Sequence, residues 1–357
     1  MINAPSVFST TFIFLNGFQS SWMNSTNSVF AKIYKVENIE IKEPYNTNFK
    51  KTKVIDKAFD SAFKLLLSKI VSSDDYDRVN INNLNIIRPM VNSFSIVDEQ
   101  FINNQYSAKF DVLFEKKKIL NFLNNKNIIS SIPKEKKIIF FPILVNLENN
   151  ELFLYEQNIF FNNWKIDENP SYLLKYSLPA EDLEDIKHLT ENINNIEQID
   201  FKEILNKYNN EDYIVSIFFQ EKKNLNILSK INLDNKQSII KTDFSNVEIK
   251  EFNDQKRIIK YLKTTFENKW KKNNEINTSI KLFLTLSANS KDLVLLNKIE
   301  EALLESDLIY KFNVEKISNL ETVYKIVYNG TPDKFITDFQ NKKFKIDISN
   351  ENWVIYE

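Results

Sequence analysis

The sequence offers few side chains for chemistry that relies on thiols, histidines or nucleotide-binding loops. It contains no cysteine and one histidine, His188, which excludes thiolate catalysis, disulfides, cysteine-ligated metals and any zinc site or mechanism that needs two histidines. Its two glycines, Gly17 and Gly330, are not close in the sequence, so the glycine-rich loops that cradle nucleotide phosphates are excluded as well. His188 follows Glu184 by four residues on a predicted helix, and we interpret it as part of a surface contact.

Clustered acids are the next candidates, because carboxylates are the ligands that calcium and magnesium prefer. The densest cluster follows Pro179 and consists of Glu181, Asp182, Glu184 and Asp185. Acids are favoured by the helix dipole in the first turn of a helix, so we interpret this cluster as a helix beginning and not as a metal site. A second cluster, from Asp74 to Asp77, lacks the glycine and the later glutamate of a calcium loop, and we interpret it as a polar turn.

Basic residues next to an aromatic ring could bind single-stranded nucleic acid, as the run from Lys269 to Lys272 around Trp270 suggests. However, Trp270 continues an apolar stripe with Ile258, Leu262 and Phe266 at intervals of four residues, which predicts a place in the core. The run Lys116 to Lys118 lies at a predicted strand-to-helix junction and needs no ligand. The chain has 47 lysines and arginines against 48 acids, so its overall charge gives no reason to expect a nucleic-acid partner, and we predict none. Since the missing motifs and the bland interpretation of each cluster leave no site, we also predict no cofactor, metal or catalytic residue.

The first 31 residues carry no charged side chain, and Val7 to Phe18 is an apolar stretch within them. This stretch is shorter than the roughly 20 residues that a spanning helix needs, but it fits the hydrophobic region of a signal peptide. Val29 and Ala31 supply small residues at the positions that a signal peptidase reads, and no other stretch approaches membrane-spanning length. We predict a signal peptide over residues 1–31 and a periplasmic protein; the alternative is a disordered leader or a wrongly assigned start codon, with a cytoplasmic protein.

If the chain is exported, removal of the signal peptide should lower the mass of the mature protein. Protein recovered from the native host should begin at Lys32, and its intact mass should be lower by the mass of residues 1–31. A species that still begins at Met1 in the cytosol would contradict the prediction.

Strand and helix patterns alternate along the chain, which is too long for one ordinary core. We therefore predict an α+β protein with three small sheet-and-helix domains, whose elements would position any site. The predicted domains cover residues 32–135, 136–250 and 251–357, with Pro133 near the first boundary. The first contains a strand over 33–41, a helix over 54–71, a strand pair over 90–97 and 104–114, and a short helix. The second begins with a nearly continuous apolar strand over 138–147.

The last predicted domain begins with a helix over 254–271 and continues in the order βαββαβ, which is the ferredoxin-like pattern. Ser290 is predicted to cap one helix, and Thr331 followed by Pro332 to begin the other. The alternation of apolar residues predicts burial of a set of side chains in this domain: Leu284, Leu296, Val314, Ile326 and Phe335.

Several stretches resemble the domain-of-unknown-function 2066 family of exported bacterial proteins. They are Lys57 to Phe63, Ser93 to Glu99, Gln105 to Phe114, Phe141 to Val145, Leu178 to Asp185, and Tyr208 ahead of Tyr213 to Val215. The resemblance covers roughly residues 32–219 and depends on the order and spacing of these stretches. It implies an exported α+β protein of unknown biochemical role, with no catalytic residues to transfer.

Two functions follow as hypotheses. The first is a non-catalytic envelope protein that binds other proteins or the cell wall, because few reaction types are open to this set of residues, and sheets with exposed edges are ordinary binding surfaces. The second is a carboxylate-dependent hydrolase, which would need two acids converging in a cleft, at least one with a raised pKa. The spacing of the 48 acids singles out no such pair.

Overall fold

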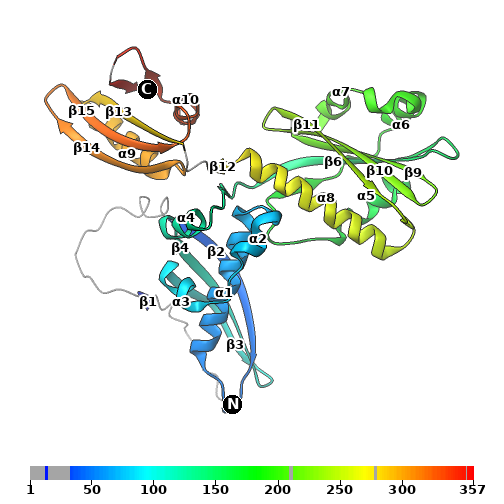
Figure 1. Cartoon of the computed structure of the whole chain (residues 1–357), viewed down its shortest axis with the longest axis horizontal. Helices are drawn as coiled ribbons and strands as arrows, with labels where there is room; N and C mark the ends of the chain where they lie inside the picture. The colour runs from blue at the N-terminus through cyan, green and yellow to red at the C-terminus, as the bar shows by residue number, and fades with distance from the viewer. Residues whose placement is uncertain (1–12, 15–32, 209–211, 277–279, 351) are drawn as a thin grey trace, which may run out of the picture. The chain divides into compact units, whose positions relative to one another are not determined.

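The computed structural model describes residues 13–14, 33–208, 212–276, 280–350 and 352–357, so most of the predicted leader, including the site after Ala31, lies outside the described residues. The described chain has an α+β fold, as predicted. It divides into two compact units: unit 1 joins residues 1–132 to 275–357, and unit 2 is Pro133–Asn274. Figure 1 labels their elements, and no helix among the described residues has the length and apolarity to cross a membrane.

The first part of unit 1 is an antiparallel sheet in the order β1-β3-β4-β2 with a long helix, α1, packed against it. Helix α1 is amphipathic because Ala58, Ala62 and Leu66 recur at intervals of four and are buried. The elements are β1 (Ile13–Phe14), β2 (Ile33–Pro44), α1 (Lys51–Ile70), α2 (Ser73–Val79), α3 (Leu84–Ile87), η2 (Arg88–Met90), β3 (Val91–Ile102), β4 (Gln105–Glu115), α4 (Lys116–Asn125) and β5 (Ser130–Ser131).

The second part of unit 1 is a sheet in the order β14-β15-β13-β17-β16, with helices α9 and α10 contributing to its core. Strand β17 lies beside β13 and runs parallel to it, after a hairpin with β16. The ferredoxin-like order predicted from sequence has one final strand, so the arrangement found here does not confirm it. The elements are β12 (Glu275–Ile276), β13 (Lys281–Asn289), α9 (Leu293–Glu305), β14 (Ile309–Ile317), β15 (Glu321–Asn329), α10 (Pro332–Gln340), β16 (Lys345–Asp347) and β17 (Trp353–Tyr356).

Two local predictions for this part were wrong. Val314 is 41% exposed, because β14 is an edge strand with a register shift between Val314 and Lys316. The cap of α9 is Asp292, whose carboxylate accepts from Leu295 N, and not Ser290. The other predicted core residues are buried or, for Leu296, partly buried against the same cluster, and Thr331 caps α10 as expected.

Unit 2 is a mixed sheet with apolar clusters on both faces, in the order β11-β10-β9-β6-β7, with β8 also beside β6. Helix α8 packs on one face and helices α6 and α7 contribute to the cluster on the other (Figure 1). The elements are β6 (Lys136–Asn146), β7 (Glu151–Phe153), η3 (Tyr155–Gln157), α5 (Ile159–Asn163), η4 (Trp164–Ile166), β8 (Leu174–Ser177), α6 (Leu183–Glu191), η5 (Ile193–Gln198), α7 (Phe201–Leu205), η6 (Asn206–Tyr208), β9 (Tyr213–Glu221), β10 (Asn224–Leu233), β11 (Lys236–Phe244) and α8 (Phe252–Asn273).

Helix α8 corrects the domain boundary that was predicted at residue 251. Its buried residues Ile258, Leu262, Phe266 and Trp270 belong to the same apolar cluster as Ile138 of β6. The boundary therefore lies between residues 274 and 275, and the last predicted domain loses this helix to unit 2. The predicted first and last domains fall into one unit instead of two.

Candidate functional site

A groove in unit 2, with a volume of about 700 Å³, is the candidate functional site. Phe219 of β9, Asn226 of β10 and Asp243 of β11 lie side by side across the sheet on its floor, and Leu228 and Lys241 form part of the next row. Its wall is η5, from Ile193 to Gln198. The volume lies in the range of about 300–1,000 Å³ that is typical of ligand sites.

The direction of the strands explains why the groove lies where it does. Strands β6 and β9 are parallel neighbours, with Val145 opposite Phe219 near their carboxyl ends, and both residues line the groove. The segment between α6 and α7 contains η5, which lines the groove together with residues of the outer strands β10 and β11. In open sheets of this kind, ligands bind in the crevice outside the carboxyl ends of parallel strands.

The outer strand, β11, borders the groove and has a regular, unpaired outer edge in the described part of the sheet. It forms a hairpin with β10 through Asp234 and Asn235, whose φ angles of 50° and 59° suit a two-residue type I′ turn. All nine residue pairs, from Leu233–Lys236 to Leu225–Phe244, follow without a register shift.

This turn fixes which backbone groups of β11 point outward. A two-residue turn closes on a hydrogen-bonded pair, here Leu233 and Lys236, and such pairs then alternate along the hairpin. The even-numbered residues of β11 therefore bond to β10, and the odd-numbered residues direct their N–H and C=O groups away from it. The outward set is Gln237, Ile239, Lys241 and Asp243.

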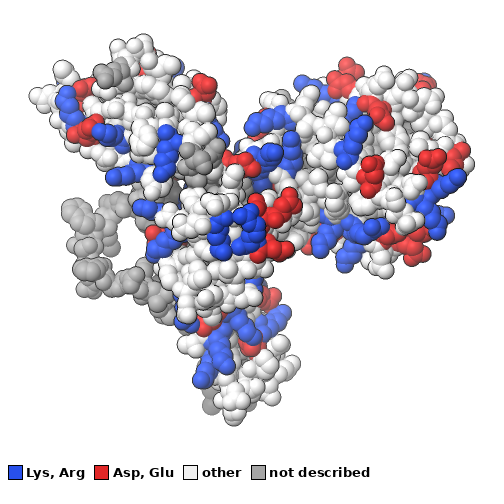
Figure 2. Space-filling model, in the orientation of Figure 1, with Lys and Arg blue, Asp and Glu red and all other residues white. Residues whose placement is uncertain are grey.

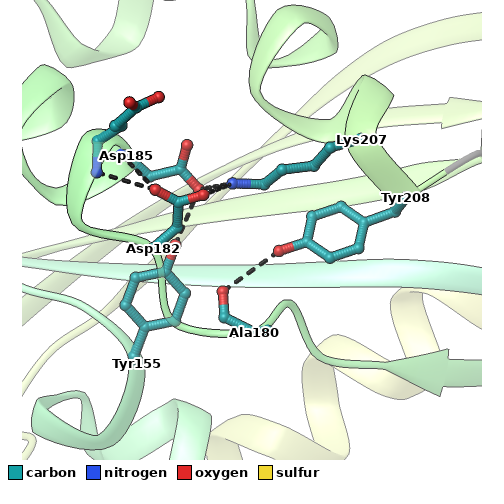
Figure 3. A network of polar contacts seen from close by, with 7 residues as sticks. Tyr155, Ala180, Asp182, Asp185, Lys207 and Tyr208 are labelled. Carbon is teal, nitrogen blue, oxygen red and sulfur yellow. Dashed lines mark hydrogen bonds and ion pairs between the residues drawn. The ribbon is translucent and has the colours of Figure 1, made fainter.

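A polar network holds the segment that carries the groove wall (Figure 3). Lys207 Nζ of η6 donates to Asp182 Oδ2 at 2.5 Å and to Asp185 Oδ2 at 2.6 Å, which joins the end of the segment to the beginning of α6. The Tyr155 hydroxyl donates to Asp185 Oδ2 at 2.9 Å, and the Tyr208 hydroxyl donates to the carbonyl of Ala180 at 3.2 Å. We call Tyr155, Asp182, Asp185, Lys207 and Tyr208 the clamp.

A further contact ties the wall to the sheet itself. Lys230 Nζ of β10 donates to the carbonyl of Ile199 at 2.9 Å, directly after η5, and lies 5.3 Å from the ring centroid of Phe201. Partial burial lowers the pKa of Lys230, against the opposing effect of nearby Asp200. The segment that carries the wall is thus fixed at both ends by the clamp and between them by Lys230.

Within the clamp, the contacts of Asp182 and Lys207 favour the charged forms of both side chains. The hydrogen bond from Lys207, followed by those from backbone N–H groups, lowers the pKa of Asp182 below its usual value. Burial lowers the pKa of Lys207, but its bonds to Asp182 and Asp185 outweigh burial and raise the pKa overall. The ion pair between Asp182 and Lys207 is therefore charged on both sides over the whole neutral range.

The acidic cluster serves helix structure, as the sequence predicted. Asp182 is the cap of α6, which begins at Leu183, and it accepts from the N–H groups of Glu184 and Asp185. The structure also gives Asp182 and Asp185 the partner Lys207, which sequence spacing could not show. Among the described residues, no group of three or more acids or histidines could hold a metal ion.

The remaining sequence candidates are dispersed. His188 is exposed on α6, and Trp270 is buried, with its indole N–H donating to the carbonyl of Lys134 at 2.7 Å. Asp74 and Asp75 lie in the first turn of helix α2, not in a turn as predicted, because the helix dipole favours acids there. Figure 2 shows lysines and acids interspersed on the visible surface.

Sequence reasoning missed Glu267, a buried acid on α8. The residue is only 3% exposed, and its two carboxylate oxygens accept from Leu173 N at 3.0 Å and Leu174 N at 2.8 Å. Burial raises the pKa of Glu267 despite these hydrogen bonds. Since both oxygens accept from backbone N–H groups where β8 begins, the carboxylate supports the fold. The acids of the groove, Glu197 and Asp243, are exposed instead.

No protein-family model matches the sequence, and a search of curated proteins found none that is similar to it. The resemblance to the domain-of-unknown-function 2066 family therefore stays a prediction.

Proposed function

We propose that this chain is a non-catalytic binding protein, and that the groove of unit 2 takes an extended segment of another polypeptide as a strand added to β11. The observation that carries the proposal is the regular outer edge of β11 directly beside the groove. Main-chain hydrogen bonds to a sheet edge supply affinity in this mode of recognition, and pockets for alternate side chains supply specificity.

The composition of the groove supports a peptide ligand. The amide side chains of Asn194, Asn195, Gln198 and Asn226 can donate to and accept from an extended backbone, while Phe219 and Leu228 offer apolar contact. The outward residues of β11 present their side chains to the same face of the sheet, where Lys241 and Asp243 line the groove. One strand could therefore use both the edge and the groove.

A second edge in the chain shows how such pairing is avoided. Strand β14 has register shifts between Ile309 and Lys311 and between Val314 and Lys316. Bulges are a device that protects sheet edges from additional strands. Strand β11 has no register shift along its pairing with β10, which favours it as the accepting edge.

The hydrolase hypothesis receives less support. It requires two converging acids, at least one with a raised pKa. Of the acids discussed here Glu267 has the raised pKa, but both of its oxygens accept backbone N–H groups. We also propose a periplasmic location, on the leader and the family resemblance alone.

Lys241→Pro tests the proposed strand addition. Proline removes the outward N–H of residue 241 without removing a hydrogen bond to β10, and Lys241→Ala controls for the loss of the side chain. Peptides selected from a random displayed library against the full chain should bind Lys241→Pro at least about tenfold more weakly, a loss of about 1.4 kcal/mol, and Lys241→Ala nearly as well as the unaltered chain.

Amide hydrogen exchange supplies the second measurement. Bound peptide should protect the outward amides of Gln237, Ile239, Lys241 and Asp243, which are otherwise open to solvent. Equal peptide affinity for Lys241→Pro and Lys241→Ala, or protection elsewhere with none on β11, would overturn the proposal.

A further inference from the structure

Unit 1 contains a separate cavity of about 820 Å³ between α4, the beginning of β13 and the beginning of β14. Apolar side chains that include Leu120, Leu303 and Phe312 form part of its wall, and lysines lie around it. The run Lys116 to Lys118 appeared from sequence to need no ligand, yet the structure places Lys116 and Lys117 on this cavity.

The charges of the cavity do not balance. Its two acids are already engaged, since Asp307 is paired with Lys116, and Glu115 with Lys118 at 2.6 Å. Among the described residues, no carboxylate forms an ion pair with the other three lysines of the lining, which are Lys117, Lys281 and Lys311.

Two of these lysines converge on one ring. The ammonium groups of Lys117 and Lys281 lie 6.0 Å and 4.6 Å from the ring centroid of Tyr310, which also lines the cavity. Contacts of this kind hold the cations in place at a modest gain in energy. Like charges held close together favour an anion beside them.

An unsatisfied acceptor provides the second, independent observation. Asn329, which is 3% exposed, lines the cavity, and its Oδ1 has no hydrogen-bond partner among the described residues. A buried polar atom without a partner destabilises the folded protein, because it has lost its hydrogen bonds to water without replacement. A ligand that carries a hydrogen-bond donor would remove this cost.

We propose that this cavity binds an anionic amphiphile, a molecule with an apolar chain and a head group that carries both negative charge and an O–H or N–H donor. The three lysines receive the charge, Asn329 Oδ1 accepts from the donor, and the apolar wall covers the chain. This site is independent of the groove proposed for unit 2.

Decyl phosphate and decyl sulfate, below the concentrations at which they form micelles, make a matched pair of probes. At about pH 5 the phosphate is mainly a monoanion with one O–H, since its second pKa is about 6, whereas the sulfate has the same charge and no donor. Calorimetry on the full chain should show binding of decyl phosphate at least about fivefold tighter than decyl sulfate, and no binding of decylamine.

The variant Lys281→Gln/Lys311→Gln should weaken decyl phosphate at least about tenfold. Lys50→Gln/Lys53→Gln is the control, because it removes the same charge from two exposed lysines at the beginning of α1 that do not line the cavity. Vesicles with acidic lipid distinguish the source of the head group: binding of both free decyl phosphate and vesicles supports a lipid ligand at this site, and binding of decyl phosphate alone supports a free metabolite.

Three results would overturn the proposal. They are equal affinity for the phosphate and the sulfate, equal weakening by the control and by Lys281→Gln/Lys311→Gln, and binding of vesicles without any binding of free decyl phosphate.

Discussion

Replacing Glu267 by alanine is expected to lower the free energy of unfolding of unit 2 by about 3–5 kcal/mol. The substitution leaves the N–H groups of Leu173 and Leu174 buried without their acceptors, and it removes the neighbouring charge from Lys271, which is itself buried. Urea denaturation followed by tryptophan fluorescence measures the loss, because Trp164 and Trp270 both lie in the core of unit 2.

The loss of stability caused by Glu267→Ala should depend on pH in a defined direction. Burial raises the folded-state pKa of Glu267 above its unfolded value, so the ionised form costs stability in the folded protein. The unaltered chain therefore gains stability from this group as pH falls through the folded pKa, and Glu267→Ala does not. The difference between them should widen on acidification.

Glu248→Ala is the control, because Glu248 is exposed in the same unit and its contact with Lys223 is 3.8 Å long. It should change the free energy of unfolding by less than about 0.5 kcal/mol. A loss below about 1 kcal/mol for Glu267→Ala, or a difference that narrows as pH falls, would contradict the role assigned to this carboxylate.

Helix α8 shows both the reach and the limit of the sequence patterns. Ile258, Leu262, Phe266 and Trp270 recur every four residues, so the helix and its buried stripe could be predicted. The neighbouring column, Lys263, Glu267 and Lys271, has the same spacing and is also buried. Charged residues are solvated by default, and their burial depends on partners from β8 and η4 that no local pattern encodes.

The groove was missed for a related reason. Strand β11 is an outer strand whose sequence mixes Lys236, Ser238 and Thr242 with few apolar residues, so it lacks the alternation that identifies a half-buried strand. The strongly apolar β6 was predicted, because a strand covered on both faces is continuously apolar. The exposed edge that we propose to be functional therefore carries the weakest pattern.

The clamp also combines one contact that the sequence could predict with others that it could not. The cap at Asp182 could be predicted, since acids shortly after Pro179 indicate the beginning of a helix, and this signal depends only on residues close in the sequence. Lys207 lies 22 residues from Asp185 and 25 from Asp182, and the two ends of the segment meet only when it folds onto the sheet. Contacts of that range depend on tertiary structure and could not be predicted.

Lys207→Met is expected to lower the free energy of unfolding of unit 2 by about 2–3 kcal/mol, less than for a fully buried pair because the Lys207 side chain is 35% exposed. The substitution leaves Asp185, with a side chain only 10% exposed, beside Tyr155 without its counter-charge. Since the clamp joins both ends of the segment that carries the groove wall, the affinity for selected peptides should fall as well.

The pH profile separates this effect from a general loss of packing. The pKa of Asp182 is lowered, so its contribution is present above the unfolded pKa and is lost as pH falls through the folded pKa. The pKa of Lys207 is raised, so its contribution is present below 10.5 and is lost as pH rises through the folded pKa. The difference between the unaltered chain and Lys207→Met should be constant near neutrality and shrink at both extremes. Lys202→Met, at an exposed position on α7, should leave stability and peptide affinity unchanged, and a uniform difference across the whole pH range would show that the ion pairs do not hold the wall.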